Sequence, residues 1–339
     1  MEEDDFDART YPQRGIRHQL PKCSASYDCT RAPSVTIRRM NRNSSALTEV
    51  STWLSSAWDG LGLIVVLTGA GISAESGIPT FRGEEGYWRI GSRNYFPEEL
   101  ATRVAFERMP DEIWGWYLYR RSVCRAAQPN AGHLALARLE HELASRGNAD
   151  RFLLITQNVD GLHLRAGHTL ERTYQIHGNI DFMRAAHDRD ASIHPLPVEL
   201  GTHWERGQPV GERERALLVC PDGSPARPHV LWFDESYDEE HFRFDSSLSA
   251  IERAALLIVV GTSGATNLPS MIVRRAAQRS IPLLVINRDE SPFAALASDL
   301  PNGMFAQARA GDVLPHLVDV LLRRCAADVD SRAHPQRIQ

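Results

Sequence analysis

Residues 63–74 read LIVVLTGAGISA, a run of apolar and β-branched side chains that ends abruptly in glycine. The run from Leu63 to Leu67 has no polar alternation, which is typical of a strand buried on both faces of a parallel sheet. The glycines that follow match the G-x-G-x-x-G/A pattern of dinucleotide-binding turns, with Ala74 in the third position, and would leave backbone N–H groups free for phosphate. No acidic residue follows a second strand at the usual distance, so a tight turn without a ligand is the alternative interpretation.

Four further apolar runs repeat this pattern, and helical periodicity fills the gaps between them. The runs lie at residues 152–156, 230–233, 256–260 and 282–286, and the helical patterns at residues 45–58, 111–127, 130–146, 239–253, 268–279 and 312–324. This alternation predicts an α/β fold with a doubly wound, Rossmann-like parallel sheet. Residues 181–227 break the alternation and are interpreted as a small inserted module. The large domain would comprise residues 46–180 and 228–325, with a helical part of the small domain at about 84–128.

Small or polar residues follow each predicted strand of the sheet. Thr68 to Gly71, Gln157 to Asp160, His177 to Asn179, Gly261 to Ser263 and Asn287 to Asp289 come directly after an apolar run. The carboxyl ends of parallel strands share one edge of the sheet, and ligands of open α/β sheets bind outside that edge. The sequence therefore predicts a site for a substantial polar ligand there.

The bulk properties exclude several classes of protein. The longest apolar runs have five or six residues, far short of the roughly 20 that span a bilayer. The net charge of −5 comes without a dense basic cluster, which argues against nucleic-acid binding. The acidic start has no apolar segment behind it, and the five cysteines include no C-x-x-C pair, so we expect a cytoplasmic protein in a reducing compartment. Residues 1–45 and 326–339 are expected to be flexible tails, and Met40 is an alternative start.

Six motifs in a fixed order go further than composition. They are GAGISAESGIPTFRG (69–83), TQNVDGLH (156–163), IHGN (176–179), RPHVLWFDE (227–235), GTS (261–263) and VIN (285–287). Over about residues 45–325 the chain resembles the sirtuins, which are NAD-dependent protein lysine deacylases. The resemblance implies NAD as cofactor and acyl-lysine proteins as partners.

The resemblance also assigns roles to individual residues. His177 would be the catalytic general base, because histidine, with an unperturbed pKa of ~6.5, suits proton removal from a ribose hydroxyl near neutral pH. The implied cofactor-binding residues are Gly69, Ala70, Gly71, Thr80, Phe81, Arg82, Gln157, Asn158, Asp160, Gly261, Thr262, Ser263, Asn287 and Ala310.

The predicted helix at 111–127 suggests the acyl group. Tyr117 and Arg120 are three residues apart and so share one helical face. Sirtuins that prefer succinyl or malonyl groups resemble this pattern, in which a Tyr-x-x-Arg pair binds the distal carboxylate. The alternative is that Tyr117 is a core residue and that Arg120 or Arg121 is simply solvated. Val230 and Phe233 would flank the bound peptide.

The structural zinc site of the family is largely missing. Arg184 to Asp188 stand where the resemblance implies that the first cysteine pair should follow IHGN, and Cys220 alone precedes RPHVLWF. His187, His194 and His203 fit no ligand spacing, so we predict no metal. Without a metal, the module would either depend on a few apolar residues for its stability or be partly mobile. The apolar residues are Leu196, Val198, Leu200 and Trp204. Asp234 stands where the family usually has glycine, which puts peptide docking in doubt.

The leading hypothesis is therefore a lysine deacylase that removes succinyl or malonyl as well as acetyl groups, giving nicotinamide and O-acyl-ADP-ribose. An NAD glycohydrolase or ADP-ribosyltransferase on the same scaffold is one alternative. A non-catalytic sensor of NAD or ADP-ribose is another.

Overall fold

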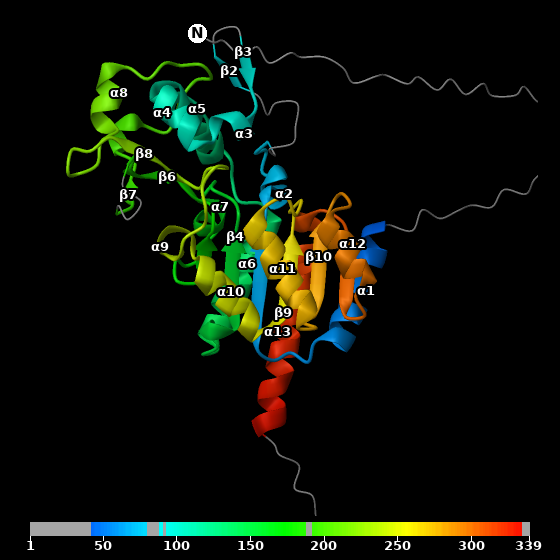
Figure 1. Ribbon diagram of the computed structural model, residues 1–339. Helices are drawn as coiled ribbons and strands as arrows, with labels where there is room; N and C mark the ends of the chain where they lie inside the picture. Colours follow the sequence, from blue (N-terminus) through cyan, green and yellow to red (C-terminus); the bar gives the residue numbers. More distant parts are fainter. Residues whose placement is uncertain (1–41, 80–87, 91–92, 188–191, 334–339) are drawn as a thin grey trace, which may run out of the picture. The chain divides into compact units, whose positions relative to one another are not determined.

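A six-stranded parallel sheet organises the protein, as the computed structural model shows for the described residues 42–79, 88–90, 93–187 and 192–333 (Figure 1). All adjacent strands pair in parallel. Their order across the sheet is β11 (Gly303–Gln307), β10 (Leu283–Asn287), β9 (Ala254–Val260), β1 (Leu63–Thr68), β4 (Phe152–Thr156) and β5 (Thr173–Gln175). The predicted Rossmann-like fold class is confirmed.

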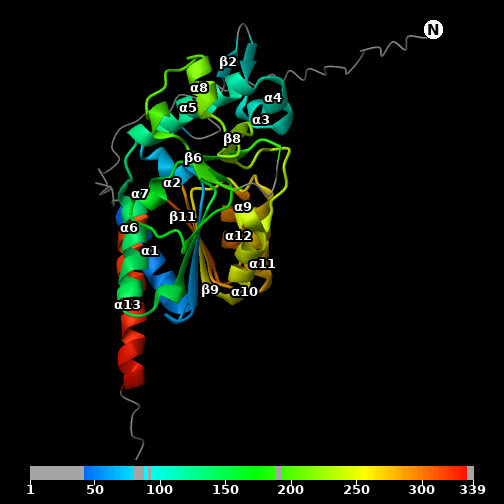
Figure 2. The same cartoon turned by 90° about the vertical axis from the view of Figure 1, so that its left-hand side faces the viewer.

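Helices cover both faces of this sheet (Figure 2). Successive residues of β1 point to opposite faces, so Ile64 and Val66 pack on one side and Val65 and Leu67 on the other. The first side is covered by α1 (Arg42–Ala57), α6 (Ala131–Ser145) and α13 (Ala310–Ala333), and the second by α10 (Phe244–Arg253), α11 (Asn267–Gln278) and α12 (Pro292–Asp299). No described helix is long and apolar enough to cross a membrane.

A second hydrophobic core lies beyond the edge of the sheet at which α2 (Ala70–Ala74) begins (Figure 1). It surrounds an antiparallel sheet of order β7 (His194–Pro195), β6 (Gly178–Ala185) and β8 (Ala226–Val230). The other elements here are β2 (Trp88–Ile90), β3 (Arg93–Tyr95), α3 (Pro97–Leu100), α4 (Arg103–Arg108), α5 (Pro110–Ala126), η3 (Val198–Leu200) and α8 (Glu212–Leu217). Short elements elsewhere are η2 (Ala149–Arg151), α7 (Leu162–Arg165) and α9 (Glu239–Phe242).

Two expectations about elements were wrong, and two strands were not expected. The strand expected at 230–233 is β8, which ends at Val230 and belongs to the antiparallel sheet. The helix expected at 239–253 is two helices, because Arg243 adopts φ 54° and ends α9. The apolar runs did not predict β6 or β11.

The second core does not depend on the few residues named from the sequence. Leu196, Leu200 and Trp204 are buried in it, whereas Val198 is 86% exposed, contrary to expectation. Helix α5 adds five more buried side chains, which are Ile113, Trp114, Trp116, Tyr117 and Leu118. Buried aromatic side chains contribute large apolar areas, so the packing of α5 stabilises the antiparallel sheet.

The place of the zinc cysteines is filled by backbone pairing and small apolar groups. Ala185 pairs with Ala226 across the sheet, Val219 pairs with Pro225, and Cys220 is a buried free thiol. In the part of the chain that the structure describes, no group of three or more His, Cys, Asp or Glu side chains could hold a metal ion. These residues do not fit a structural zinc site.

Candidate functional site

The first turn of the site joins β1 to β9. The N–H of Gly69 donates to the Val260 carbonyl (3.0 Å), and that of Gly71 to the Gly261 carbonyl (2.7 Å). A Cβ on Gly71 would lie 2.6 Å from the Cα of Gly261, so both positions require glycine for this close approach. The glycine pattern predicted backbone N–H groups free to bind phosphate. The N–H groups of Gly69 and Gly71 instead form hydrogen bonds within the protein.

The loop after β4 brings three polar side chains to the same edge. The Gln157 amide donates to the Thr262 hydroxyl (2.9 Å), and the Asn158 amide donates to the Gly69 carbonyl (3.1 Å) and the Ser73 hydroxyl (3.0 Å). The Ser73 hydroxyl in turn donates to Asp160 (2.7 Å). Burial raises the pKa of Asp160 against these hydrogen bonds. The network fixes the loops after β1, β4 and β9 relative to one another.

His177 follows β5, where the chain leaves the parallel sheet for β6. Gly178 has φ 83°, and a Cβ on it would lie 2.1 Å from the His229 carbonyl oxygen, so the IHGN motif needs glycine to let β6 pair with β8. The N–H of Leu231 donates to the His177 carbonyl (3.0 Å). The imidazole Nε2 lies 2.8 Å from the hydroxyl of Tyr237, and burial lowers the pKa of His177 to about 4. The ring is therefore neutral at physiological pH, as a general base must be.

The Tyr117 and Arg120 pair lies on α5, above the same edge. Tyr117 is buried, and its hydroxyl accepts a hydrogen bond from Trp232 Nε1 (3.0 Å). Burial raises the pKa of Tyr117 to about 12, so the phenol is neutral. The Arg120 guanidinium lies 5.4 Å from the ring centre of Trp116, a cation–π contact, and is half-buried. Arg120 is thus held against the aromatic core rather than fully solvated.

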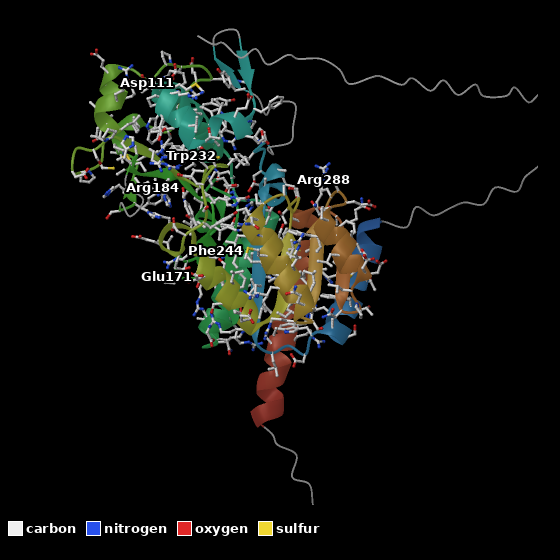
Figure 3. The ribbon with its side chains drawn as sticks, in the orientation of Figure 1. Asp111, Glu171, Arg184, Trp232, Phe244 and Arg288 are labelled. Carbon is white, nitrogen blue, oxygen red and sulfur yellow. The ribbon has the colours of Figure 1, made fainter. Side chains whose placement is uncertain are left out.

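The remaining predicted site residues that the structure describes lie near the ends of β8, β9 and β10 and at the start of α13. Asn287 donates to the Thr262 carbonyl (3.3 Å), and Ser263 is half-buried beside it in sequence. Arg288, labelled in Figure 3, marks the same end of β10. Ala310 is buried at the start of α13. Val230 is buried in the second core and Phe233 is 57% exposed. Thr80, Phe81 and Arg82 lie outside the described residues.

Comparison with known proteins agrees with this arrangement. The family described as "Sir2 family" matches residues 69–267, more than half of the chain. The chain belongs to the Sir2 family. A protein of Leptospira interrogans named NAD-dependent protein deacylase is 38% identical over 261 residues, covering 76% of this chain and 93% of that protein. NAD-dependent protein deacylase 2 of Pyrobaculum aerophilum is 40% identical over 260 residues, covering 77% and 91%.

Vertebrate and structural relatives extend the comparison. The mitochondrial NAD-dependent protein deacylase sirtuin-5 of Danio rerio is 35% identical over 267 residues, covering 75% of this Sir2-family chain and 82% of that protein. The structure of a Sir2 homolog–NAD complex superposes with a TM-score of 0.62 at 32% identity, covering 82% of this chain and 94% of that one.

Two structural features of this Sir2-family chain were missed or misjudged from its sequence. Asp234 was expected to suffer from a left-handed conformation, but it is not among the described non-glycine residues with positive φ. Its carboxylate instead accepts the N–H groups of Arg103 (2.8 Å) and Val104 (3.3 Å) at the start of α4. A carboxylate at a helix N-terminus is stabilising, so aspartate there has a structural role.

Buried polar residues behind the site were also missed. His133 is fully buried, and its Nε2 lies 3.4 Å from the Ser73 hydroxyl oxygen. The ring centres of His133 and His163 are 4.8 Å apart. His163 Nε2 lies 3.0 Å from the Thr68 hydroxyl oxygen. Ser73 lies within the glycine motif and inside the short helix α2, so a polar residue among these small and apolar ones was a usable signal. Tyr237 gave no signal, because no pattern of types or spacing connects it with His177.

Proposed function

We propose that this Sir2-family chain is an NAD-dependent protein lysine deacylase acting on acyl-lysine side chains of proteins. The observation that carries the proposal is the neutral imidazole of His177 at the carboxyl edge, next to the hydrogen-bonded loops of Asn158 and Asp160. Its relatives are named for the same activity. A pure binding protein would have no need of a base at this position.

The residues at the edge are compatible with NAD. Gly71 and Gly261 keep side chains out of the turn between β1 and β9, while Gln157 and Asn158 after β4 and Asn287 at the end of β10 contribute amide groups. Such convergent polar groups suit a large polar ligand at a sheet edge. When bound, NAD supplies the ribose carbon that accepts the acyl oxygen as nicotinamide leaves.

His177 would act on the ribose hydroxyl whose oxygen attacks the transferred acyl group. Nε2 takes the proton, so that one O–H bond breaks and one N–H bond forms. General base catalysis contributes typically about 10²–10⁴-fold. We therefore expect His177→Ala to lower deacylation by about that factor.

The acyl preference is the finer part of the proposal. Tyr117 has a neutral phenol beside Trp232, and Arg120 is one helical turn away with its guanidinium on Trp116. A fixed arginine fork and a phenol can together bind a terminal carboxylate. This supports a preference for succinyl or malonyl over acetyl.

One mass-spectrometric time course tests both parts, using NAD and matched peptides with succinyl- or acetyl-lysine. We expect succinyl removal to exceed acetyl removal, and Arg120→Met to reduce succinyl kcat/KM by about 10–100-fold, the effect of one charge-assisted pair of hydrogen bonds. Acetyl removal should change by less than about threefold. Arg138→Met, which removes an exposed ion pair between Arg138 of α6 and Asp319 of α13, is the matched control.

Two results would contradict the proposal. Equal losses on both peptides in Arg120→Met would remove the acyl preference. Nicotinamide release that is the same without any peptide would instead support a glycohydrolase.

A further inference from the structure

The base nitrogen of His177 already has a partner in the free protein. Nε2 lies 2.8 Å from the hydroxyl oxygen of Tyr237, and the two ring centres are 5.8 Å apart. The nitrogen that the proposed reaction needs is therefore hydrogen-bonded to a second side chain.

The direction of this hydrogen bond follows from the other ring nitrogen. The His177 ring also has a hydrogen bond with the Gln157 backbone. The Gln157 N–H donates to the Thr68 carbonyl (2.9 Å), so the group that meets the ring is the Gln157 carbonyl, which can only accept. A neutral imidazole has one N–H, so Nδ1 carries it and Nε2 has only a lone pair. Tyr237 must then donate its O–H to Nε2. Burial raises the pKa of Tyr237 to about 12, which keeps that proton on the phenol.

Tyr237 is held in place from several directions. Its oxygen accepts from the Leu268 backbone and contacts the Thr266 side chain, and its ring stacks on Phe244 with centroids 6.3 Å apart. The next residue, Asp238, caps α9 by accepting the N–H of His241 (2.7 Å). The segment runs from Trp232 in the second core to Phe244 against the sheet core, and Figure 3 labels both ends.

Thr266 offers the phenolic proton a second acceptor. The Thr266 hydroxyl donates its own proton to Gln157 Oε1 (3.0 Å), so its oxygen can accept one from Tyr237. Rotation of the phenolic O–H from Nε2 to Thr266 would free the base without moving the tyrosine ring. One hydrogen bond replaces another, so the exchange costs little.

We propose that Tyr237 is a positioning residue for the general base, holding the lone pair of His177 Nε2 in the free enzyme and turning to Thr266 when a ribose hydroxyl takes its place. This inference rests on the proposed deacylase function. It explains why the base has the correct tautomer and orientation before the ligand arrives, with Gln157 fixing Nδ1 and Tyr237 fixing Nε2.

The test compares wild type with Tyr237→Phe, which keeps the ring and its packing on Phe244 and removes only the hydroxyl. A donor to the neutral imidazole disfavours protonation, so its loss should raise the pKa of His177 by about half to one pH unit. Nitrogen NMR of histidine-labelled full-length protein measures this pKa without any turnover, with the signal assigned by His177→Ala. In the part of the chain that the structure describes, Tyr237 is the titratable group at Nε2, and burial and the Gln157 backbone are the other influences.

Kinetics provide the second measurement. Between pH 6 and 5, Tyr237→Phe should lose about a fifth to a half of its kcat/KM for deacylation, while wild type loses no more than about a tenth. Peptide-dependent nicotinamide release, which precedes the base-assisted step, should change by less than about threefold. Tyr174→Phe makes the same chemical change on β5, three residues from His177, and should behave as wild type.

An unchanged His177 pKa in Tyr237→Phe would overturn the inference. So would equal loss of nicotinamide release and deacylation at every pH, which would indicate a structural role only. If wild type shows no deacylation but the NMR shift is present, the contact stands and the proposed function fails, so the two failures are distinguishable.

Discussion

At the scale of residues, buried histidines make the protein sensitive to mild acid. Burial lowers the pKa of His133 and of His229 to about 3, and that of His163 well below its ordinary value. In the unfolded chain these groups titrate near ~6.5. The unfolded state therefore binds more protons than the folded state once the pH falls below that value, and each histidine makes folding less favourable as the solution is acidified.

This predicts a loss of stability between pH 7.5 and 5.5. Each of His133 and His229 should contribute a decrease of about 1 kcal/mol in the free energy of unfolding over that interval. Asp160 has the opposite effect on stability, because its raised pKa favours folding at lower pH. The combined effect of the buried histidines is larger than that of this single carboxyl group. Glu140 and Glu235 have lowered pKa values and act only at lower pH.

Urea unfolding followed by circular dichroism at the two pH values measures the effect. The midpoint should be lower at pH 5.5, and His133→Gln should reduce the difference because it removes one of the titrating groups. Equal midpoints at both pH values in the wild-type protein would contradict this account.

At the scale of elements, a strand could be predicted from the sequence when its own residues show that it is buried, and not when its charged side chains pair with residues far away in the chain. Strand β1 was recognisable because every residue in it is apolar apart from Thr68, and both faces are covered by helices. Strand β6 reads GNIDFMRA and carries Asp181 and Arg184 inside a buried element. Their partners lie far away in sequence: Arg121 for Asp181, and Glu235 at 3.9 Å for Arg184. Local pattern cannot reveal charges that are neutralised by distant residues.

Asp181 also connects two elements of the proposed site. Its Oδ1 accepts from Arg121 and Arg125 of α5, each at 2.8 Å, and the side chains of Asp181 and Arg121 are 13% and 8% exposed. The same helix carries Tyr117 and Arg120, while Asp181 follows His177 by four residues. This pair of ion pairs therefore sets the position of α5, the proposed acyl-binding helix, relative to His177, the proposed base.

We expect Asp181→Asn to destabilise the protein by about 2–4 kcal/mol, because it leaves the buried Arg121 guanidinium without its counter-charge. The KM for the acyl-peptide should rise several-fold, with a smaller change in the KM for NAD. Thermal unfolding and steady-state kinetics measure the two effects. Asp319→Asn removes an ion pair whose side chains are both 47% exposed, and should cost no more than about 1 kcal/mol. Similar melting temperatures for the two variants would argue against a role for Asp181 in positioning α5.

At the scale of the whole molecule, the sequence predicted the parallel sheet and the edge at which the site lies, but not how the rest of the protein is held. The motifs after β1, β4, β5, β9 and β10 identified the edge because polar residues there interrupt apolar runs. The missing cysteines were visible, yet what replaces them was not. The second core joins α5 to segments about a hundred residues later in the chain, with the Trp114 indole donating to the Ala226 carbonyl (3.1 Å), and such pairing leaves no trace in local periodicity.

The second core also contains a buried ion pair that ties β8 to the segment after it. The Arg227 guanidinium binds both carboxylate oxygens of Glu235 and lies 3.3 Å from the ring centre of Trp232. Arg227 also donates to the Val230 carbonyl (2.9 Å). A bidentate, cation–π-supported pair of this kind fixes geometry as well as charge, so the module has a framework that does not involve thiolates.

Chelation should therefore leave the stability of this protein unchanged. In a metal-stabilised module the binding free energy of zinc is part of the folding free energy, and chelators unfold it. Here we expect the melting temperature in excess EDTA or 1,10-phenanthroline to stay within about 1 °C of the untreated value, because packing replaces that contribution. Trp204→Ala, which removes a large side chain from the second core, should by contrast cost about 3–5 kcal/mol and lower the melting temperature by several degrees. A chelator-induced drop comparable to that of Trp204→Ala, together with stoichiometric zinc in the purified protein, would show that a metal holds the module after all.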